Sequence, residues 1–252
     1  ASVNIDDRNG RVMVQNTSAK VSTYSLRSMA DFRCKVIENH LDGMLLSIDG
    51  IEVWTRLIGG FNAYNLLAIY SAARLLGFDT QDVLTALSVM QPVAGRFEHM
   101  KAPNGVLAVV DYAHTPDALQ NVIDTINEIR TSEQRLITVV GAGGNRDKTK
   151  RPVMARVAVL GSSMVVLTSD NPRFEEPEAI LEDMKAGVEP ANVGKALTIV
   201  DRREAIRTAC FLAKPGDIVL VAGKGHENYQ EIKGVKHHFD DKEVIADVFK
   251  SL

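Results

Sequence analysis

The sequence predicts an α/β protein, most of which is an open, mostly parallel sheet covered by helices on both faces. From residue 96 onward, short runs of Val, Ile and Leu alternate with segments of helical periodicity, a pattern typical of strand–helix–strand crossovers. The runs are apolar at nearly every position, as expected for strands that are buried on both faces. We therefore expect a complete α/β domain in residues 96–252.

The first 95 residues predict a smaller and less complete unit. "SVNIDD" is typical of a buried strand, and "GMLLSIDGIEVWTRL" contains two β-rich runs joined by Asp49-Gly50, a dipeptide suited to a two-residue hairpin. The apolar spacing in "GGFNAYNLLAIYSAARLLG" predicts a helix that ends at Gly77. A second helix is expected near Thr80 to Met90. Pro92 and Gly95 then indicate a linker, so we place the domain boundary at residue 95.

The remaining elements alternate. Strands are expected in "VLAVV", "RLITVV", "MVVLTS", "ALTIV" and "DIVLVA", and helices are expected to begin at Pro116, about Pro152, Pro177 and Arg202. Two of these helices have local start signals. Thr115 directly precedes Pro116, which suits a capping residue followed by proline in the first turn. Asp201 stands three residues before Glu204, an arrangement similar to a capping box.

The composition is that of a globular protein, because 45% of residues are apolar and 24% are charged. No apolar stretch approaches the roughly 18 residues of a membrane-spanning helix, and no signal-peptide pattern is present; we expect a cytoplasmic protein. A net charge of -3 argues against a nucleic-acid partner. Cys34 and Cys210 lie far apart without metal-ligand spacing, so we expect buried packing residues and no metal site.

Polar residues concentrate in four loops that follow predicted strands: "DYAHTPDA", "GAGGNRDKTKRP", "DNPRFEEP" and "GKGHENYQ". The carboxyl ends of parallel strands share one edge of the sheet, where ligands gather near helix N-termini. We therefore expect one site at this edge. The charged and polar candidates in these loops are Asp111, His114, Arg146, Asp147, Lys148, Asp170, Asn171, Arg173, Lys224, His226 and Glu227.

These side chains suit a ligand with several charges. The planar guanidinium of arginine binds a carboxylate with two hydrogen bonds, whereas an ammonium group needs acceptors such as a carboxylate. Arg146 and Arg173, facing Asp170 and Glu227, would complement an amino acid better than a phosphate or a sugar. A dinucleotide fingerprint is not predicted, because Arg146 replaces the third glycine in "GAGGNR".

Each loop also has a purely structural alternative. Asp111 and His114 could serve as turn and helix-cap residues, and Asn171-Pro172 could form only a turn. Gly223 and Gly225 could simply let the chain bend, although glycines on both sides of a lysine also expose backbone amides to a ligand.

Six segments together resemble the Mur ligase family of bacterial cell-wall synthesis. "LIGGFNAYN", "GRFE", "VVDYAHTPDAL", "GGNRDKTKRP", "SDNPRFEEP" and "VAGKGHENYQ" occur in the family's order and approximate spacing, and the likeness runs from "VNIDD" onward. The resemblance implies that residues 1–95 are the C-terminal remnant of a central ATP-binding domain. It also implies that residues 96–252 form a complete, Rossmann-like, amino-acid-binding ligase domain.

The resemblance implies a role for individual residues. Those matching the nucleotide site are Asn62, Asn65, Arg96 and Asp111, and the expected catalytic residues are Arg96, Asp111 and His114. Those matching the site of the incoming amino acid are Arg146, Asp170, Asn171, Pro172, Arg173, Gly223 and Glu227. "DNPR" is the variant of members that add meso-diaminopimelate. Relatives that add lysine lack this arginine, so Arg173 would bind the distal carboxylate that lysine does not have.

The implied reaction uses ATP and Mg²⁺. The D-glutamate carboxyl group of UDP-MurNAc-L-Ala-D-Glu becomes an acyl phosphate, and the amine of meso-diaminopimelate attacks it and releases phosphate. The protein would mainly align the reactants and neutralise phosphate charge. Glu227 or His226 could assist the loss of the amine proton.

The sequence contains no phosphate loop of the G-x-x-x-x-G-K-[ST] type. The resemblance therefore predicts that the chain is the C-terminal part of a longer enzyme and is inactive alone. The missing part would supply this loop, a UDP-binding domain and a modified lysine that helps to hold magnesium. Two alternatives remain. The first is another ligase, either a relative that adds lysine or a relative of the polyglutamate or cyanophycin synthetases. The second is a stand-alone amino-acid-binding module.

Overall fold

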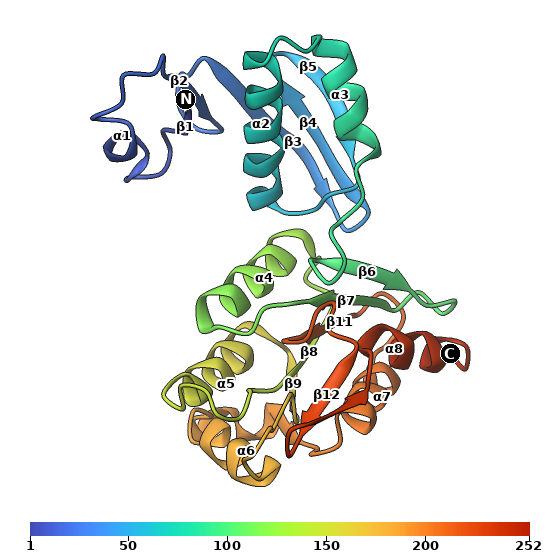
Figure 1. Ribbon diagram of the computed structural model, residues 1–252. Coiled ribbons are helices and arrows are strands. Elements are labelled where there is room, and N and C mark those ends of the chain that lie inside the picture. Colours follow the sequence, from blue (N-terminus) through green and yellow to red (C-terminus); the bar gives the residue numbers. More distant parts are fainter. The chain divides into compact units, whose positions relative to one another are not determined.

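The computed structural model describes residues 1–252 and divides into two compact units (Figure 1). The N-terminal unit spans Ala1–Pro92, and the C-terminal unit spans Val93–Leu252. Each unit has a hydrophobic core of its own, formed between its sheet and the helices that pack on it. None of the helices combines the length and apolarity that crossing a membrane requires.

The N-terminal unit contains a five-stranded sheet in the order β1-β2-β3-β4-β5. The bounds are Ser2–Asn4 (β1), Ser22–Ser25 (β2), Phe32–His40 (β3), Gly43–Ile48 (β4) and Ile51–Thr55 (β5). The first three strands are parallel, and the last three form an antiparallel meander. Between β4 and β5, Asp49 and Gly50 have φ angles of 48° and 87°, as a two-residue hairpin with a primed turn requires. The predicted hairpin is therefore confirmed.

Two helices, α2 (Gly60–Leu75) and α3 (Thr80–Val89), pack against this sheet, and a short helix, α1 (Gly10–Met13), precedes β2. Both longer helices agree with the sequence pattern. Gly77 follows α2 with a φ of 90°, and Asp79 caps α3 by accepting the N–H groups of the first helical turn. The core side chains include Met44, Leu46, Leu66, Leu67 and Leu84.

The C-terminal unit contains a six-stranded sheet in the order β10-β9-β8-β11-β7-β6. The bounds are Glu98–Lys101 (β6), Leu107–Asp111 (β7), Leu136–Val140 (β8), Met164–Leu167 (β9), Ala196–Thr198 (β10) and Ile218–Ala222 (β11). All pairs are parallel except β6 with β7. The open, mostly parallel sheet predicted from the apolar runs is confirmed. The antiparallel edge strand β6 and the hairpin of β12 (Tyr229–Ile232) and β13 (Val235–His238) are additions.

Helices cover both faces of this sheet (Figure 1). One layer consists of α4 (Pro116–Ile129), α5 (Lys150–Gly161) and α6 (Pro177–Lys185), and the other of α7 (Arg202–Leu212) and α8 (Asp241–Phe249). A 3-10 helix at Pro190–Lys195 precedes β10.

The predicted start signals are borne out at two of these helices. Thr115 Oγ1 accepts the N–H of Ala118 at the start of α4, and Asp201 caps α7. The helix expected from about Pro152 begins at Lys150, because proline is tolerated within the first turn of a helix.

Candidate functional site

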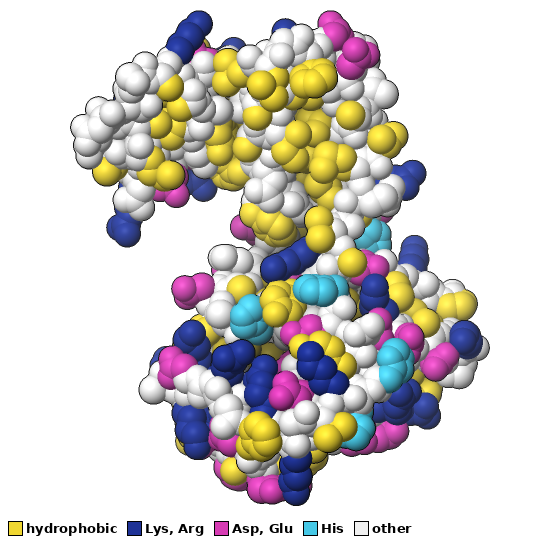
Figure 2. Space-filling view, in the orientation of Figure 1, with side chains coloured by type: hydrophobic (Ala, Val, Ile, Leu, Met, Phe, Trp, Pro, Cys, Tyr) yellow, Lys and Arg dark blue, Asp and Glu magenta, His cyan; other side chains and the backbone are white.

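A cavity of about 370 Å³ opens in the C-terminal unit, in the loops that follow β7, β8, β9 and β11. The predicted residues that line it are His114, Arg146, Asp147, Asp170, Asn171, Arg173, Gly223 and Glu227. The four loops singled out in the sequence therefore meet at one place, as the parallel topology requires. In the space-filling view, basic, acidic and histidine side chains lie intermingled on the visible face of this unit (Figure 2).

Arg146 and Arg173 both lie beside Gly143. A Cβ atom built on Gly143 would lie 2.9 Å from Arg173 Nη1 and 3.6 Å from Arg146 Cγ, so the missing side chain leaves room for both. Arg173 Nη1 donates to the carbonyl oxygen of Gly144 at 2.8 Å, and its Nε lies 3.5 Å from a Glu231 carboxylate oxygen. Two guanidinium groups from different loops thus reach the same cavity.

The backbone of Arg173 is itself unusual, with a φ of 52°. Non-glycine residues rarely adopt this left-handed conformation. It is held by two backbone bonds to the β12–β13 hairpin, since the N–H of Arg173 donates to the Glu231 carbonyl and its own carbonyl accepts the N–H of Lys233. The hairpin therefore orients the loop that carries Arg173.

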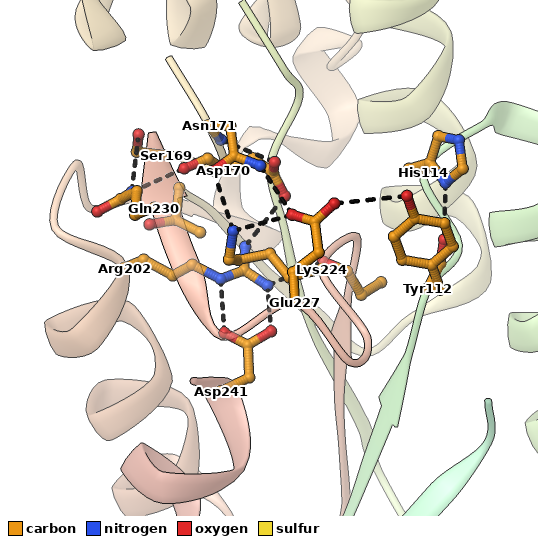
Figure 3. Close-up of polar contacts among 12 residues, drawn as sticks. Tyr112, His114, Ser169, Asp170, Asn171, Arg202, Lys224, Glu227, Gln230 and Asp241 are labelled. Carbon is orange, nitrogen blue, oxygen red and sulfur yellow. Dashed lines mark hydrogen bonds and ion pairs between the residues drawn. The ribbon is translucent and has the colours of Figure 1, made fainter. Parts of the chain in front are cut away.

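Asn171 and Glu227 are joined through a buried lysine (Figure 3). Asn171 Nδ2 donates to Glu227 Oε2 at 2.9 Å, and Lys224 Nζ lies 3.1 Å from Asn171 Oδ1 and 3.3 Å from Glu227 Oε2. The Tyr112 hydroxyl donates to Glu227 Oε1 at 3.4 Å. Burial, followed by the Glu227 charge, raises the pKa of Tyr112, so its hydroxyl stays protonated as a donor. Three donors therefore fix the Glu227 carboxylate at the cavity wall.

A second buried cation, Arg151, supports the neighbouring wall. Its side chain is 1% exposed and pairs with Glu175 and Asp183, each at 2.8 Å. Arg151 and the N–H of Asn145 lower the pKa of Glu175 to about 2. Arg151 Nη2 also donates to the carbonyl oxygen of Gly143 at 3.3 Å, so this cluster ties the loop that carries Arg146 to the loop that carries Arg173.

Tyr112 is surrounded by cationic and aromatic groups at the end of β7. The Arg96 guanidinium lies 5.0 Å from its ring centroid, and the His114 and His226 rings lie at 4.6 and 5.2 Å. His114 Nδ1 donates to the Tyr112 carbonyl oxygen at 2.8 Å. Asp111 is buried beside this cluster, where its Oδ2 accepts the N–H of Phe97 at 2.7 Å, and burial raises its pKa.

Not every predicted residue lies at the cavity. Arg96, Asp111 and Pro172 are outside its lining. Asn62 and Asn65 belong to α2 of the N-terminal unit, where Asn65 Nδ2 donates to Asn62 Oδ1 at 3.2 Å, so the two share one helix face.

Some residues that build the site were not predicted. These residues are Tyr112, Arg151, Arg202 and Asp241, which bond to the cavity wall or lie beneath it. Lys224 was one of the loop candidates, and the structure places it between Asn171 and Glu227. Lys224 had a sequence signal in its two flanking glycines. The others gave none, because their roles come from tertiary pairing. No group of three or more His, Cys, Asp or Glu side chains is arranged to hold a metal ion.

The sequence matches the Mur ligase glutamate ligase domain over residues 95–225 and the Mur ligase middle domain over residues 1–73. The chain belongs to the Mur ligase family. It is 61% identical over 249 residues to the UDP-N-acetylmuramoyl-L-alanyl-D-glutamate--2,6-diaminopimelate ligase of Phocaeicola vulgatus, covering 99% of this chain and 51% of that protein. It is 45% identical over 250 residues to the ligase of the same name from Lactiplantibacillus plantarum, covering 98% of this chain and 50% of that protein.

Solved structures agree with this membership. A ligase of the same name has a TM-score of 0.72 at 40% identity, covering 100% of this Mur ligase chain and 53% of its own. MurF ligase from Thermotoga maritima, solved in complex with ADP, has a TM-score of 0.68 at 20% identity over 100% of this chain and 53% of its own, which supports the fold alone. The chain spans about half the length of the curated relatives it matches, 51% in the first case.

Proposed function

We propose that this chain provides the amino-acid-binding part of a ligase that joins meso-diaminopimelate to UDP-MurNAc-L-Ala-D-Glu in peptidoglycan precursor synthesis. The observation that carries the proposal is the presence of Arg146, Arg173, Asp170 and Glu227 around one cavity. Two guanidinium groups and two carboxylates complement a substrate with two carboxylates and two ammonium groups. The named relatives are ligases of 2,6-diaminopimelate, which agrees with this chemistry.

Each side chain then has a distinct task. Arg173 binds the distal carboxylate of the substrate, and Arg146 binds the carboxylate beside the reacting amine. Glu227 and Asp170 accept hydrogen bonds from the ammonium groups. These contacts hold the amine in place for attack, which lowers the entropic part of the barrier. Glu227 is better suited to binding than to removing a proton, because Lys224, Asn171 and Tyr112 already donate to it.

The nucleotide part of the proposal rests on fewer groups. Arg96, above the Tyr112 ring, offers a positive charge for a phosphate, and Asp111 offers an acceptor for a ribose hydroxyl. ATP, when bound, supplies the phosphoryl group that activates the D-glutamate carboxyl group. No group of three or more His, Cys, Asp or Glu side chains in this chain is arranged to hold a metal ion, so we derive no step through magnesium. Because the sequence has no phosphate loop, we expect the isolated chain to form no product from ATP, the UDP-dipeptide and meso-diaminopimelate.

Calorimetric titration of the 252-residue chain with meso-diaminopimelate and with lysine tests the proposal. We expect meso-diaminopimelate to bind more tightly, because a charged hydrogen-bonded pair contributes about 1.5–3 kcal/mol, or roughly 10–150-fold in affinity. Arg173→Ala should remove this preference. Arg156→Ala is the matched control, because Arg156 is exposed and pairs only with Glu189. Equal binding of both amino acids by the unmodified chain would favour the lysine-adding alternative, and no binding of either would contradict the proposal.

A further inference from the structure

A fully buried ion pair lies beneath the cavity, between Arg202 at the start of α7 and Asp241 at the start of α8 (Figure 3). Arg202 Nε and Nη2 each donate to one oxygen of Asp241 at 2.8 Å. Nη2 also donates to the carbonyl oxygen of Ala222, the last residue of β11, at 3.1 Å. These bonds fix the plane of the guanidinium group relative to the strand that leads into the cavity.

The remaining nitrogen of this group, Arg202 Nη1, points to the cavity residue Asp170. It has no hydrogen-bond partner, and it lies 4.0 Å from Asp170 Oδ2, which is also buried without a partner. The other oxygen, Asp170 Oδ1, accepts the N–H of Asn171 at 2.7 Å. An unpaired buried charge is costly. The two unsatisfied groups, Arg202 Nη1 and Asp170 Oδ2, therefore form an electrostatic contact in which each compensates the charge of the other.

Gly223 makes this approach possible. A Cβ atom at this position would lie 2.8 Å from Asp170 Oδ2, inside contact distance, and the residue has a φ of 116°, a conformation that side chains disfavour. The glycine that was predicted as a substrate contact therefore also lets the Asp170 carboxylate lie against the end of β11.

We propose that Arg202 is a positioning residue that sets the Asp170 carboxylate at the wall of the amino-acid cavity. No other cation lies within 4.0 Å of that carboxylate. Lysine could not replace Arg202, because one ammonium group cannot bond both oxygens of Asp241, the Ala222 carbonyl and Asp170 together. The role in substrate binding rests on the proposed function, whereas the link between Arg202 and Asp170 does not.

A double-mutant cycle tests the proposal, with Arg202→Lys, Asp170→Asn and both changes together. Arg202→Lys keeps the charge that Asp241 needs, so the protein should fold. We expect it to weaken meso-diaminopimelate binding by about tenfold, the scale of coupled charges in one network. In the Asp170→Asn background the same change should have little further effect. Asp241→Asn should weaken binding in the same direction, because it releases the guanidinium group.

Arg135→Lys is the matched control. Arg135 also pairs with an aspartate, Asp217, at 2.6 Å, but this pair lies at the amino ends of β8 and β11, away from the cavity at their carboxyl ends. We expect the affinity of the Arg135→Lys variant for meso-diaminopimelate to stay within about twofold of that of the unmodified chain. Equal loss of affinity from Arg202→Lys with and without the Asp170 carboxylate would overturn the proposal.

The same cycle measured by urea unfolding needs no ligand. If the unmodified chain does not bind meso-diaminopimelate, the proposed function fails, while coupling between Arg202 and Asp170 in unfolding still supports the positioning link. If the two substitutions change the free energy of unfolding by strictly additive amounts, the positioning link between Arg202 and Asp170 is refuted.

Discussion

Replacing Lys224 by Met tests whether a single buried ammonium group joins two loops of the site. Lys224 is 0% exposed, and its Nζ contacts Asn171 Oδ1 and Glu227 Oε2. Methionine has a similar volume and remains apolar along its length, so little cavity or overpacking is introduced. The substitution therefore removes mainly the charge and its two contacts.

The loss of unfolding free energy in Lys224→Met depends on the hydrogen bonds that Glu227 and Asn171 retain. Removing one member of a fully buried ion pair costs about 3–5 kcal/mol. Glu227 is 17% exposed and keeps the donors Asn171 and Tyr112, and Asn171 Oδ1 keeps the N–H of Glu231. We therefore expect a smaller loss, about 2 kcal/mol. For a unit of this size, that lowers the thermal midpoint by about 4–8 °C.

Calorimetry and urea unfolding measure this loss in the transition of the C-terminal unit, and titration with meso-diaminopimelate measures its effect on the site. We expect the affinity to fall at least about tenfold, since the Glu227 carboxylate loses one of its anchors. Lys236→Met is the control, because Lys236 is exposed and its Nζ lies 4.1 Å from the centroid of the Tyr229 ring, which Lys224 Nζ also faces at 5.3 Å. If Lys224→Met unfolds within about 0.5 kcal/mol of this control, the reasoning is refuted.

Three further predictions follow from local geometry. Gly144→Ala should destabilise the C-terminal unit by about 1–3 kcal/mol in thermal unfolding, because the new Cβ atom would lie 1.9 Å from the Pro172 carbonyl oxygen; an unchanged midpoint would contradict this. Because the pKa of Glu175 is lowered from 4.5 to about 2, its stabilisation is complete above pH 4.5 and is lost as the pH falls toward 2. Glu175→Gln should therefore show a shallower loss of unfolding free energy over that range. Burial raises the pKa of Cys34 and Cys210 to about 12, so mass spectrometry should find neither thiol alkylated by iodoacetamide at pH 8 in the folded chain.

The central strands of the C-terminal sheet could be predicted because a parallel sheet covered on both faces leaves their side chains buried. Val, Leu and Ile fill β7, β8 and β11 almost completely, and every residue of these strands is buried. The edge strand β6 and the strand β13 escaped prediction for the opposite reason. β13 is exposed at all four positions, so no burial pattern exists in its sequence.

The part of the site that could be predicted from the sequence is the part whose position the order and direction of the strands determine. Motifs that follow parallel strands must meet at one edge, and Arg146, Arg173 and Glu227 do so. The supporting layer could not be predicted, because Arg202 and Asp241 are 39 residues apart in different helices. Arg202 begins α7 and Asp241 begins α8. The helix dipole disfavours a cation at a helix start only weakly, so neither position indicated a tertiary partner.

The arrangement separates substrate preference from the framework of the site. Arg202 and Lys224 are fully buried, and each contacts a carboxylate or amide that lines the cavity. Arg173 is 21% exposed, and apart from backbone bonds its side chain contacts only the Gly144 carbonyl and Glu231. Under the proposed function, changes at Arg173 should alter the recognition of the distal carboxylate with little loss of stability. Changes at the buried cations should reduce stability and, under the same proposal, amino-acid binding together, because they move Asp170, Asn171 or Glu227 at the cavity wall.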